Sequence, residues 1–198
     1  TLYSVTTNAE GKEVKTEIKT VNAASYDFGT LDAGKYYVEA TGINKATENN
    51  DRQPIDAMYV TVTQAYSDVT IVENYSRGES ELDEIAAGSN EVWVHVVDQT
   101  NGTEMTGLTA DDFAAKNLLN LDINITNCDG SYKDGYYLLT LAKDVGVTRD
   151  DNMLTVEFKG NKNYKGDSDD VPVVATPAAE YTQKLKVTGT SAADMKGT

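Results

Sequence analysis

Hydrophobic and polar residues alternate along most of this chain, in short runs separated by segments rich in glycine, asparagine and aspartate. Leu154, Val156 and Phe158 share one face of such a run, and polar residues occupy the positions between them. This alternation is typical of a strand with one buried face. We therefore expect strands at 2–7, 12–19, 26–28, 36–41, 57–63, 91–98, 121–127, 136–142, 154–159 and 171–175.

One arrangement of strand, polar loop and strand occurs twice. The strand at 154–159 is followed by a loop through position 170 and a short apolar strand with Pro172, which only a strand start or an edge tolerates. The strand at 36–41 is likewise followed by a polar loop and the strand at 57–63. Short strands with frequent turns are typical of β-sandwiches. We place two sandwich modules at 1–65 and 66–176, and a linker with the first strand of a following unit, 181–188, at 177–198.

One segment of the second module carries helix signals instead. Thr109 can cap a helix start, and Asp111 and Asp112 favour the positive end of the helix dipole. We expect a short helix that ends near Leu118. The predicted fold class is therefore all-β, with tandem sandwich domains and one short helix in the second.

The first module is shorter than a complete immunoglobulin-type sandwich, which takes about 100 residues. Its opening strands are either absent from the chain or supplied by another molecule. Because an unpaired strand edge is a template for another chain, the strand expected at 181–188 is a candidate to complete the first module of a neighbouring copy. The alternative is that both chain ends are cuts in a longer protein, from which flanking modules were removed.

The charge of the chain excludes some partners. Its 198 residues include 32 acidic and 17 basic side chains, which give a net charge of -15. A surface this acidic repels nucleic acids and anionic lipids. No run of 18 apolar residues predicts a transmembrane span. We therefore expect neither a nucleic-acid partner nor direct membrane insertion.

Three phrases resemble known repeats. Positions 28–38 (FGTLDAGKYYV) resemble the AG-x-Y-x-V strand of bacterial immunoglobulin-like modules. Positions 158–166 (FKGNKNYKG) are similar to the F-x-G-N-x-N-Y ending of immunoglobulin-like, Big-type repeats in prokaryotic adhesins and S-layer proteins. Positions 106–113 (TGLTADDF) are similar to the GLT-x-x-DF phrase of such repeats. The resemblance implies tandem immunoglobulin-like modules that stack end to end and carry no catalytic residues.

The resemblance also implies a function. We expect a structural repeat segment of an exported, extracellular cell-surface protein of S-layer or adhesin type, whose partners are neighbouring modules or copies of itself. The alternative is an accessory module of an extracellular enzyme or adhesin. It would bind carbohydrate or protein through exposed rings, since Tyr36-Tyr37 and Tyr136-Tyr137 each place one ring on each strand face. Self-assembly favours the first interpretation, and saturable glycan binding favours the second.

Acidic loops are the candidate metal site. Asp167, Asp169 and Asp170 in one loop, and Asp150 and Asp151 in another, are candidate calcium ligands. Calcium prefers several oxygen ligands from flexible loops. The alternative is that these carboxylates are solvated and only keep the protein soluble.

Catalysis is not expected. His95 is the only histidine and Cys128 the only cysteine, so neither a zinc site nor a catalytic triad can be assembled from the usual groups. The sequence also lacks the common nucleophile and phosphate-binding motifs. We expect His95 to pack on the face of its strand with Trp93, and Cys128 to be a small buried hydrophobic residue.

Three Asn-x-Ser/Thr sequons are candidate glycosylation sites, at Asn74, Asn101 and Asn124. Asn101 is expected to be the most accessible, because Asn101-Gly102 predicts a tight hairpin turn. Chance occurrence of the sequons is the alternative.

Overall fold

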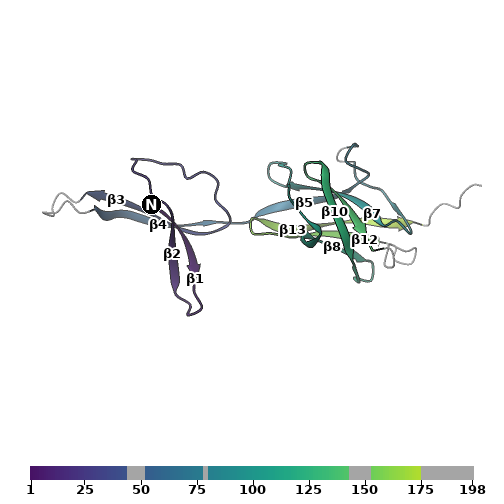
Figure 1. Cartoon of the computed structure of the whole chain (residues 1–198), viewed down its shortest axis with the longest axis horizontal. Coiled ribbons are helices and arrows are strands. Elements are labelled where there is room, and N and C mark those ends of the chain that lie inside the picture. The colour runs from purple at the N-terminus through teal and green to yellow at the C-terminus, as the bar shows by residue number, and fades with distance from the viewer. Residues whose placement is uncertain (44–51, 78–79, 143–152, 175–198) are drawn as a thin grey trace, which may run out of the picture.

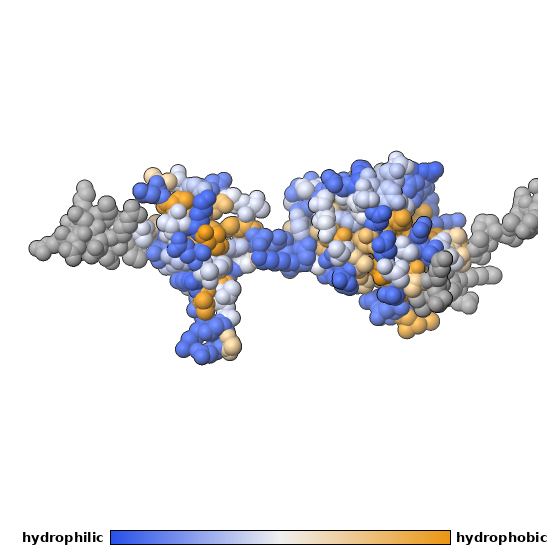
Figure 2. Space-filling view, in the orientation of Figure 1, coloured by the Kyte–Doolittle hydropathy of each residue, from blue (hydrophilic) through white to orange (hydrophobic). Residues whose placement is uncertain are grey.

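The computed structural model describes residues 1–43, 52–77, 80–142 and 153–174, and these residues are nearly all β (Figure 1). Two hydrogen-bonded sheets lie one after the other along the long axis of the molecule. A narrow hydrophilic neck joins them (Figure 2). The described part of the chain contains no α-helix, so the prediction of an all-β protein is confirmed.

The first sheet has four antiparallel strands in the order β2-β1-β3-β4. Among the side chains of this sheet that the structure describes, only Leu2, Val5 and Tyr36 are buried hydrophobic residues. Every residue of β2 is exposed, so the sheet is a single layer with little core of its own. The strands are β1 (Leu2–Thr7), β2 (Glu13–Lys19), β3 (Gly34–Ile43) and β4 (Arg52–Val62).

The expected strand at 26–28 is wrong, because this segment belongs to the loop between β2 and β3. The Asp27 carboxylate accepts a hydrogen bond from the Gly29 backbone N–H at 2.8 Å. Such a local bond offers the backbone an alternative to a sheet ladder. The rings of Tyr26 and Phe28 pack edge to face on each other within this loop.

The second sheet has nine strands along a path that folds over on itself. As a result β10-β11-β7-β5 faces β13-β12-β8-β9 across one hydrophobic core, with β6 beside β13 (Figure 1). This arrangement is consistent with a β-sandwich. The strands are β5 (Ala65–Val72), β6 (Ile85–Ala86), β7 (Glu91–Asp98), β8 (Phe113–Asn117), β9 (Asp122–Ile123), β10 (Ile125–Lys133), β11 (Tyr136–Leu141), β12 (Met153–Gly160) and β13 (Tyr164–Val174).

The core follows the alternation in the sequence. Leu154, Val156 and Phe158 of β12 are fully buried, as the pattern of that run predicts. Val92, Val94 and Val96 of β7 face them from the other layer. The expected strand at 121–127 is interrupted at Asn124, where the chain passes from β9 in one layer to β10 in the other.

The predicted helix to Leu118 is wrong, although its start signal is real. The Thr109 backbone N–H and hydroxyl both donate to the Asp112 carboxylate, at 2.7 and 2.9 Å. A 3-10 helix then spans only Ala110–Asp112, and β8 begins at the next residue. Phe113 and Ala115 alternate into the core, and β8 pairs with β12. Tertiary packing of a period-two pattern therefore overrides the local helix preference.

The expected loop through position 170 is also wrong for most of its length. β12 extends to Gly160 and β13 begins at Tyr164, so only Asn161, Lys162 and Asn163 form the turn. The residues from Lys165 to Asp170 pair with β12 instead. The alternating Asp-x-Asp spacing therefore belongs to a strand rather than to a flexible loop.

We predict that Phe158→Ala destabilises the second unit by about 3–5 kcal/mol, because it leaves a cavity among fully buried neighbours. Trp93, the only tryptophan of the chain, lies in this unit, so its fluorescence during urea unfolding measures the effect. The matched control is Leu119→Ala, which removes a side chain that is 71% exposed and should change the midpoint little. Equal midpoints for both variants would contradict the packing described here.

Candidate functional site

The candidate site is the joint between the two units. Only Thr63 and Gln64 separate the end of β4 from the start of β5. The Ala65 backbone N–H donates to the Asn163 carbonyl at 2.9 Å, and the Gln64 side chain donates to the Asn161 carbonyl at 2.7 Å. The turn between β12 and β13 therefore holds the connecting segment on its second-unit side.

The same turn binds the first unit through Asp32, which lies in the loop before β3. The Asp32 carboxylate accepts hydrogen bonds from the Lys162 ammonium at 2.6 Å and the Asn163 amide at 3.0 Å. In return, the Asn163 side-chain oxygen accepts a hydrogen bond from the Ala33 backbone N–H at 2.9 Å. Two turns that are 130 residues apart in sequence thus bind each other reciprocally. This interdomain contact is called the joint below.

The charges at the joint stabilise each other. The hydrogen bond from Lys162 lowers the pKa of the Asp32 carboxyl, and Asn163 lowers it further. The same pairing raises the pKa of Lys162. Because the pKa of Asp32 in the folded state lies below its ordinary value, the contribution of the pair is present at neutral pH. That contribution is lost as the pH falls through the lowered pKa of Asp32, and also as the pH rises through the raised pKa of Lys162.

The sequence around the turn explains why it projects these side chains. Gly160 has a φ of 82°, and a side chain there would meet the Gly166 backbone nitrogen at 2.6 Å. The Asn161 side chain accepts hydrogen bonds from the backbone N–H groups of Asn163 and Tyr164, at 2.9 and 3.0 Å. Asn161 therefore shapes the turn, and this leaves Lys162 and Asn163 to contact the first unit.

The carboxylates predicted to bind calcium lie on β13. The Asp167 carboxylate accepts a hydrogen bond from the Val69 N–H at 3.0 Å, and the Asp169 carboxylate accepts one from the Ile71 N–H at 2.7 Å. The parallel pairing of β13 with β5 covers only two residue pairs, so these side chains continue the connection by replacing ladder hydrogen bonds. Asp170 is exposed beside them.

Two of the three aspartates are therefore already engaged by the backbone of β5. Asp150 and Asp151 lie outside the described residues. Within the residues that the structure describes, no group of three or more His, Cys, Asp or Glu side chains is arranged to hold a metal ion. The calcium site stays a prediction, and a cation there would compete with backbone N–H groups for Asp167 and Asp169.

The three sequon asparagines lie in connecting segments. The Asn74 side chain is half-buried and accepts hydrogen bonds from the backbone N–H and hydroxyl of Ser76, at 2.9 and 2.5 Å. Asn101 is exposed in the turn after β7, where its side chain accepts a hydrogen bond from the Thr103 N–H at 2.8 Å. Asn124 is exposed between β9 and β10. Glycosylation of these residues stays a prediction.

His95 and Cys128 occupy structural surroundings. The His95 ring is buried, stacks on Tyr136 at 4.1 Å between centroids, and lies 2.6 Å from a Glu104 carboxylate oxygen. Cys128 packs against the core. Burial first, and then Asp112, raise the pKa of the Cys128 thiol to about 11. The thiol is therefore almost entirely protonated at neutral pH and is a poor nucleophile.

Sequence reasoning identified the two phrases that meet at the joint, but it did not predict the contact. Both phrases were interpreted as motifs of the fold, and no local feature of the sequence indicates that Asp32 and Asn163 are neighbours. The polar residues that the second phrase places in a tight turn did indicate that a contact was possible. Such side chains need hydrogen-bond partners when the turn packs against another unit.

Comparison with known proteins gives no match. No family model, no curated protein and no solved structure is significantly similar to the chain. In the described residues, no helix is long and apolar enough to cross a membrane.

We predict that Asp169→Ala destabilises the second unit by about 1–3 kcal/mol, because it leaves the Ile71 N–H without an acceptor. The control is Asp170→Ala, which removes an exposed carboxylate from the adjacent position. Urea unfolding followed by Trp93 fluorescence measures both. If Asp169→Ala and Asp170→Ala have the same small effect, the carboxylate does not link β13 to β5.

Proposed function

We propose that this chain is a structural, non-catalytic repeat segment of an exported cell-surface protein, of S-layer or adhesin type. The observation that carries the proposal is the joint, in which Asp32, Lys162 and Asn163 hold two β-units in line. A linker that merely tethers two domains needs no reciprocal contacts. A segment that sets a fixed spacing or transmits force does need reciprocal contacts, because each unit must keep its orientation relative to the next.

The first sheet supports the same proposal, because part of its surface is suited to a neighbour. The strand register places Leu2, Val38 and Met58 in one row of one face, and Thr6 and Val14 in another row of that face. Met58 is 59% exposed and Val14 is 40% exposed. Exposed apolar side chains such as these on a single-layer sheet favour contact with another module or a second copy of the chain. Immunoglobulin-like packing of the second unit is part of this proposal.

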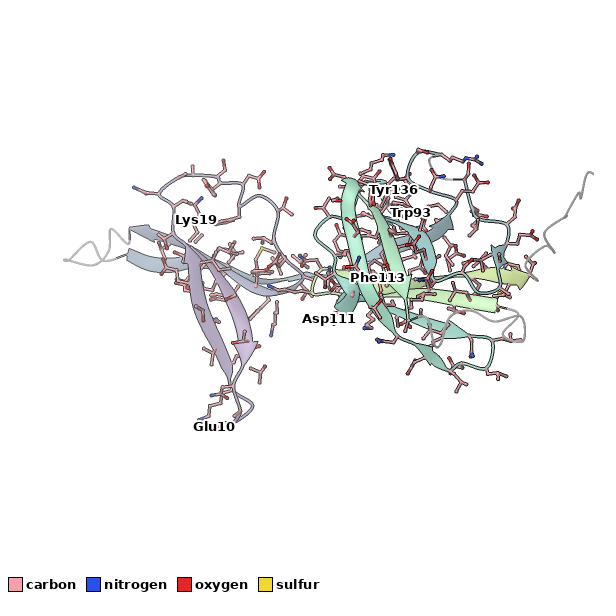
Figure 3. The ribbon with its side chains drawn as sticks, turned by 45° about the vertical axis from the view of Figure 1, so that its right-hand side comes forward. Glu10, Lys19, Trp93, Asp111, Phe113 and Tyr136 are labelled. Atoms are coloured by element: carbon pink, nitrogen blue, oxygen red, sulfur yellow. The ribbon has the colours of Figure 1, made fainter. Side chains whose placement is uncertain are left out.

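We predict that Asn163→Ala loosens the joint without unfolding either unit. The variant loses hydrogen bonds to both Asp32 and the Ala33 N–H, whereas the cores do not contain this side chain. Small-angle X-ray scattering should therefore show a broader distribution of interunit distances, with an unchanged far-ultraviolet circular dichroism spectrum. Glu10→Ala is the control, since Glu10 lies at the tip of the β1–β2 hairpin, far from the joint (Figure 3). Identical distance distributions for the wild type and Asn163→Ala would remove the main support for the proposal.

We predict that the protein self-associates as its concentration rises, and that Met58→Glu weakens this association because it places a charge on the apolar face. Sedimentation velocity over a range of concentrations, with and without millimolar calcium, measures the effect. Leu119→Glu, which alters an exposed leucine of the second unit, is the control. A concentration-independent monomer under both conditions would instead favour a spacer that contacts only its covalent neighbours.

A further inference from the structure

We infer that Tyr75, Trp93 and Tyr132 form a binding platform for the pyranose ring of a neutral carbohydrate. This inference goes beyond the structural role proposed above and does not depend on it. The three residues come from separate segments: Trp93 from β7, Tyr132 from β10, and Tyr75 from the segment after β5. They are called the aromatic platform below.

The rings of the aromatic platform form a closed triangle. Their centroids are 5.3 Å apart for Tyr75 and Trp93, 5.2 Å for Tyr75 and Tyr132, and 5.0 Å for Trp93 and Tyr132. Tyr75 is 37% exposed and Tyr132 is 48% exposed, while Trp93 is half-buried between them. The ring planes are inclined to one another by 48°, 31° and 75°, so the rings pack against each other as a cluster, and Tyr75 and Tyr132 keep part of their ring surface exposed to solvent.

The platform lies outside the core of the second unit. Val92 and Val94, which flank Trp93 on β7, point into the core, so the Trp93 side chain points to the outer face of the sheet. Figure 3 shows Trp93 near Tyr136 in the second unit, whereas Glu10 lies in the first. The core of the second unit therefore does not include these three rings, which pack on one another at the outer face of the sheet.

Fixed neighbours hold the base of the platform in place. Tyr136 packs on the next strand, where it stacks on His95 and lies 4.3 Å from the Lys133 ammonium. The Glu104 carboxylate holds the other side of the His95 ring. The strands that carry Trp93 and Tyr132 are thus braced by buried groups, and a rigid ring surface loses little conformational entropy when a ligand binds.

Polar groups at the margin match the hydroxyl edge of a sugar. Glu73 and Arg77 form an ion pair on either side of Tyr75 in the sequence. Asp129 pairs in register with Leu138, which in turn pairs with Trp93, so these residues share the outer face. A pyranose ring offers a flat C–H surface that packs on aromatic rings and equatorial hydroxyls that need charged or polar partners.

The composition of the margin also selects among ligands. A protein partner typically buries about 800 Å² on each side, whereas three partly exposed aromatic side chains, each of about 150–250 Å² in all, offer less apolar area than that. An anionic glycan is disfavoured by Glu73, Asp129 and the net charge of -15. A neutral oligosaccharide fits both restrictions.

The test uses the full chain and its single tryptophan. Trp93 fluorescence is followed during titration with neutral oligosaccharides prepared from glucan, xylan, mannan and galactan, and affinity electrophoresis in gels containing the parent polysaccharides provides a second readout. We expect a saturable change in emission with at least one of them. Tyr132→Ala and Tyr75→Ala should each weaken binding at least tenfold, and Tyr132→Phe should retain it, because the ring face rather than the hydroxyl makes the contact.

Control variants distinguish binding at the platform from nonspecific binding and from effects of the joint. Tyr66→Ala removes an exposed tyrosine of β5 outside the platform and should leave binding unchanged. Asn163→Ala should also bind normally, so failure of the proposed structural role and failure of the platform remain distinguishable. Circular dichroism verifies that each variant is folded. The inference is overturned if no neutral glycan produces a saturable change, or if the Tyr75 and Tyr132 variants bind as well as the wild type.

Discussion

The second unit depends on β5, a strand that belongs to both layers of the sandwich. One edge of β5 pairs with β7 along its whole second half, and the other edge reaches β13 through two ladder positions and then through the carboxylates of Asp167 and Asp169. Without those carboxylates, the N–H groups of Val69 and Ile71 would be unpaired beside buried side chains, at a cost comparable to a lost hydrogen bond. The alternating aspartates allow the two layers to diverge while their common edge stays hydrogen-bonded.

The same strand pair connects this corner to the first unit. β13 starts directly after the turn that binds Asp32, and only two residues lie between the end of β4 and the start of β5. The joint is therefore continuous along the chain with the edge of the sandwich at which β5 and β13 pair. A displacement of the first unit would pull on β5 and β13 together, and both strands are fixed in the core of the second unit. Because of this continuity, a narrow neck is enough to fix the orientation of the first unit relative to the second.

The two units differ in how they are stabilised. The second encloses a core, whereas the first relies on surface contacts. Examples are the mutually tilted rings of Tyr3, Tyr37 and Tyr59, and the Lys15 ammonium, which lies 3.1 Å from the centre of the Tyr37 ring. An exposed cation–π contact contributes about 0.5–1 kcal/mol. A neighbour on the apolar face of such a sheet would add more stability than a neighbour adds to a closed sandwich. We therefore expect self-assembly to involve the first unit.

The parts of the fold that could be predicted from the sequence are those fixed by local alternation. Strands such as 91–98 and 154–159 were predicted because every second side chain enters the core. The helix after Thr109 was predicted wrongly because a true cap is followed by Phe113, whose burial opposite β12 is a property of the tertiary structure. The reciprocal contacts of Asp32 and Asn163 were beyond prediction for the same reason. Each local phrase fixes a turn, but only the path of the chain between them brings the two turns together.

The joint and the aromatic platform use different residues, and this separation has a functional consequence. Asp32, Lys162 and Asn163 lie where the units meet, whereas Tyr75, Trp93 and Tyr132 lie on the outer face of the second unit. A ligand on the platform therefore leaves the joint and the apolar face of the first sheet accessible. An array of such segments could keep its length while each copy displays one sugar-binding surface. Weak individual sites on such an array would then act together, because binding at one copy raises the effective concentration of the ligand at the next.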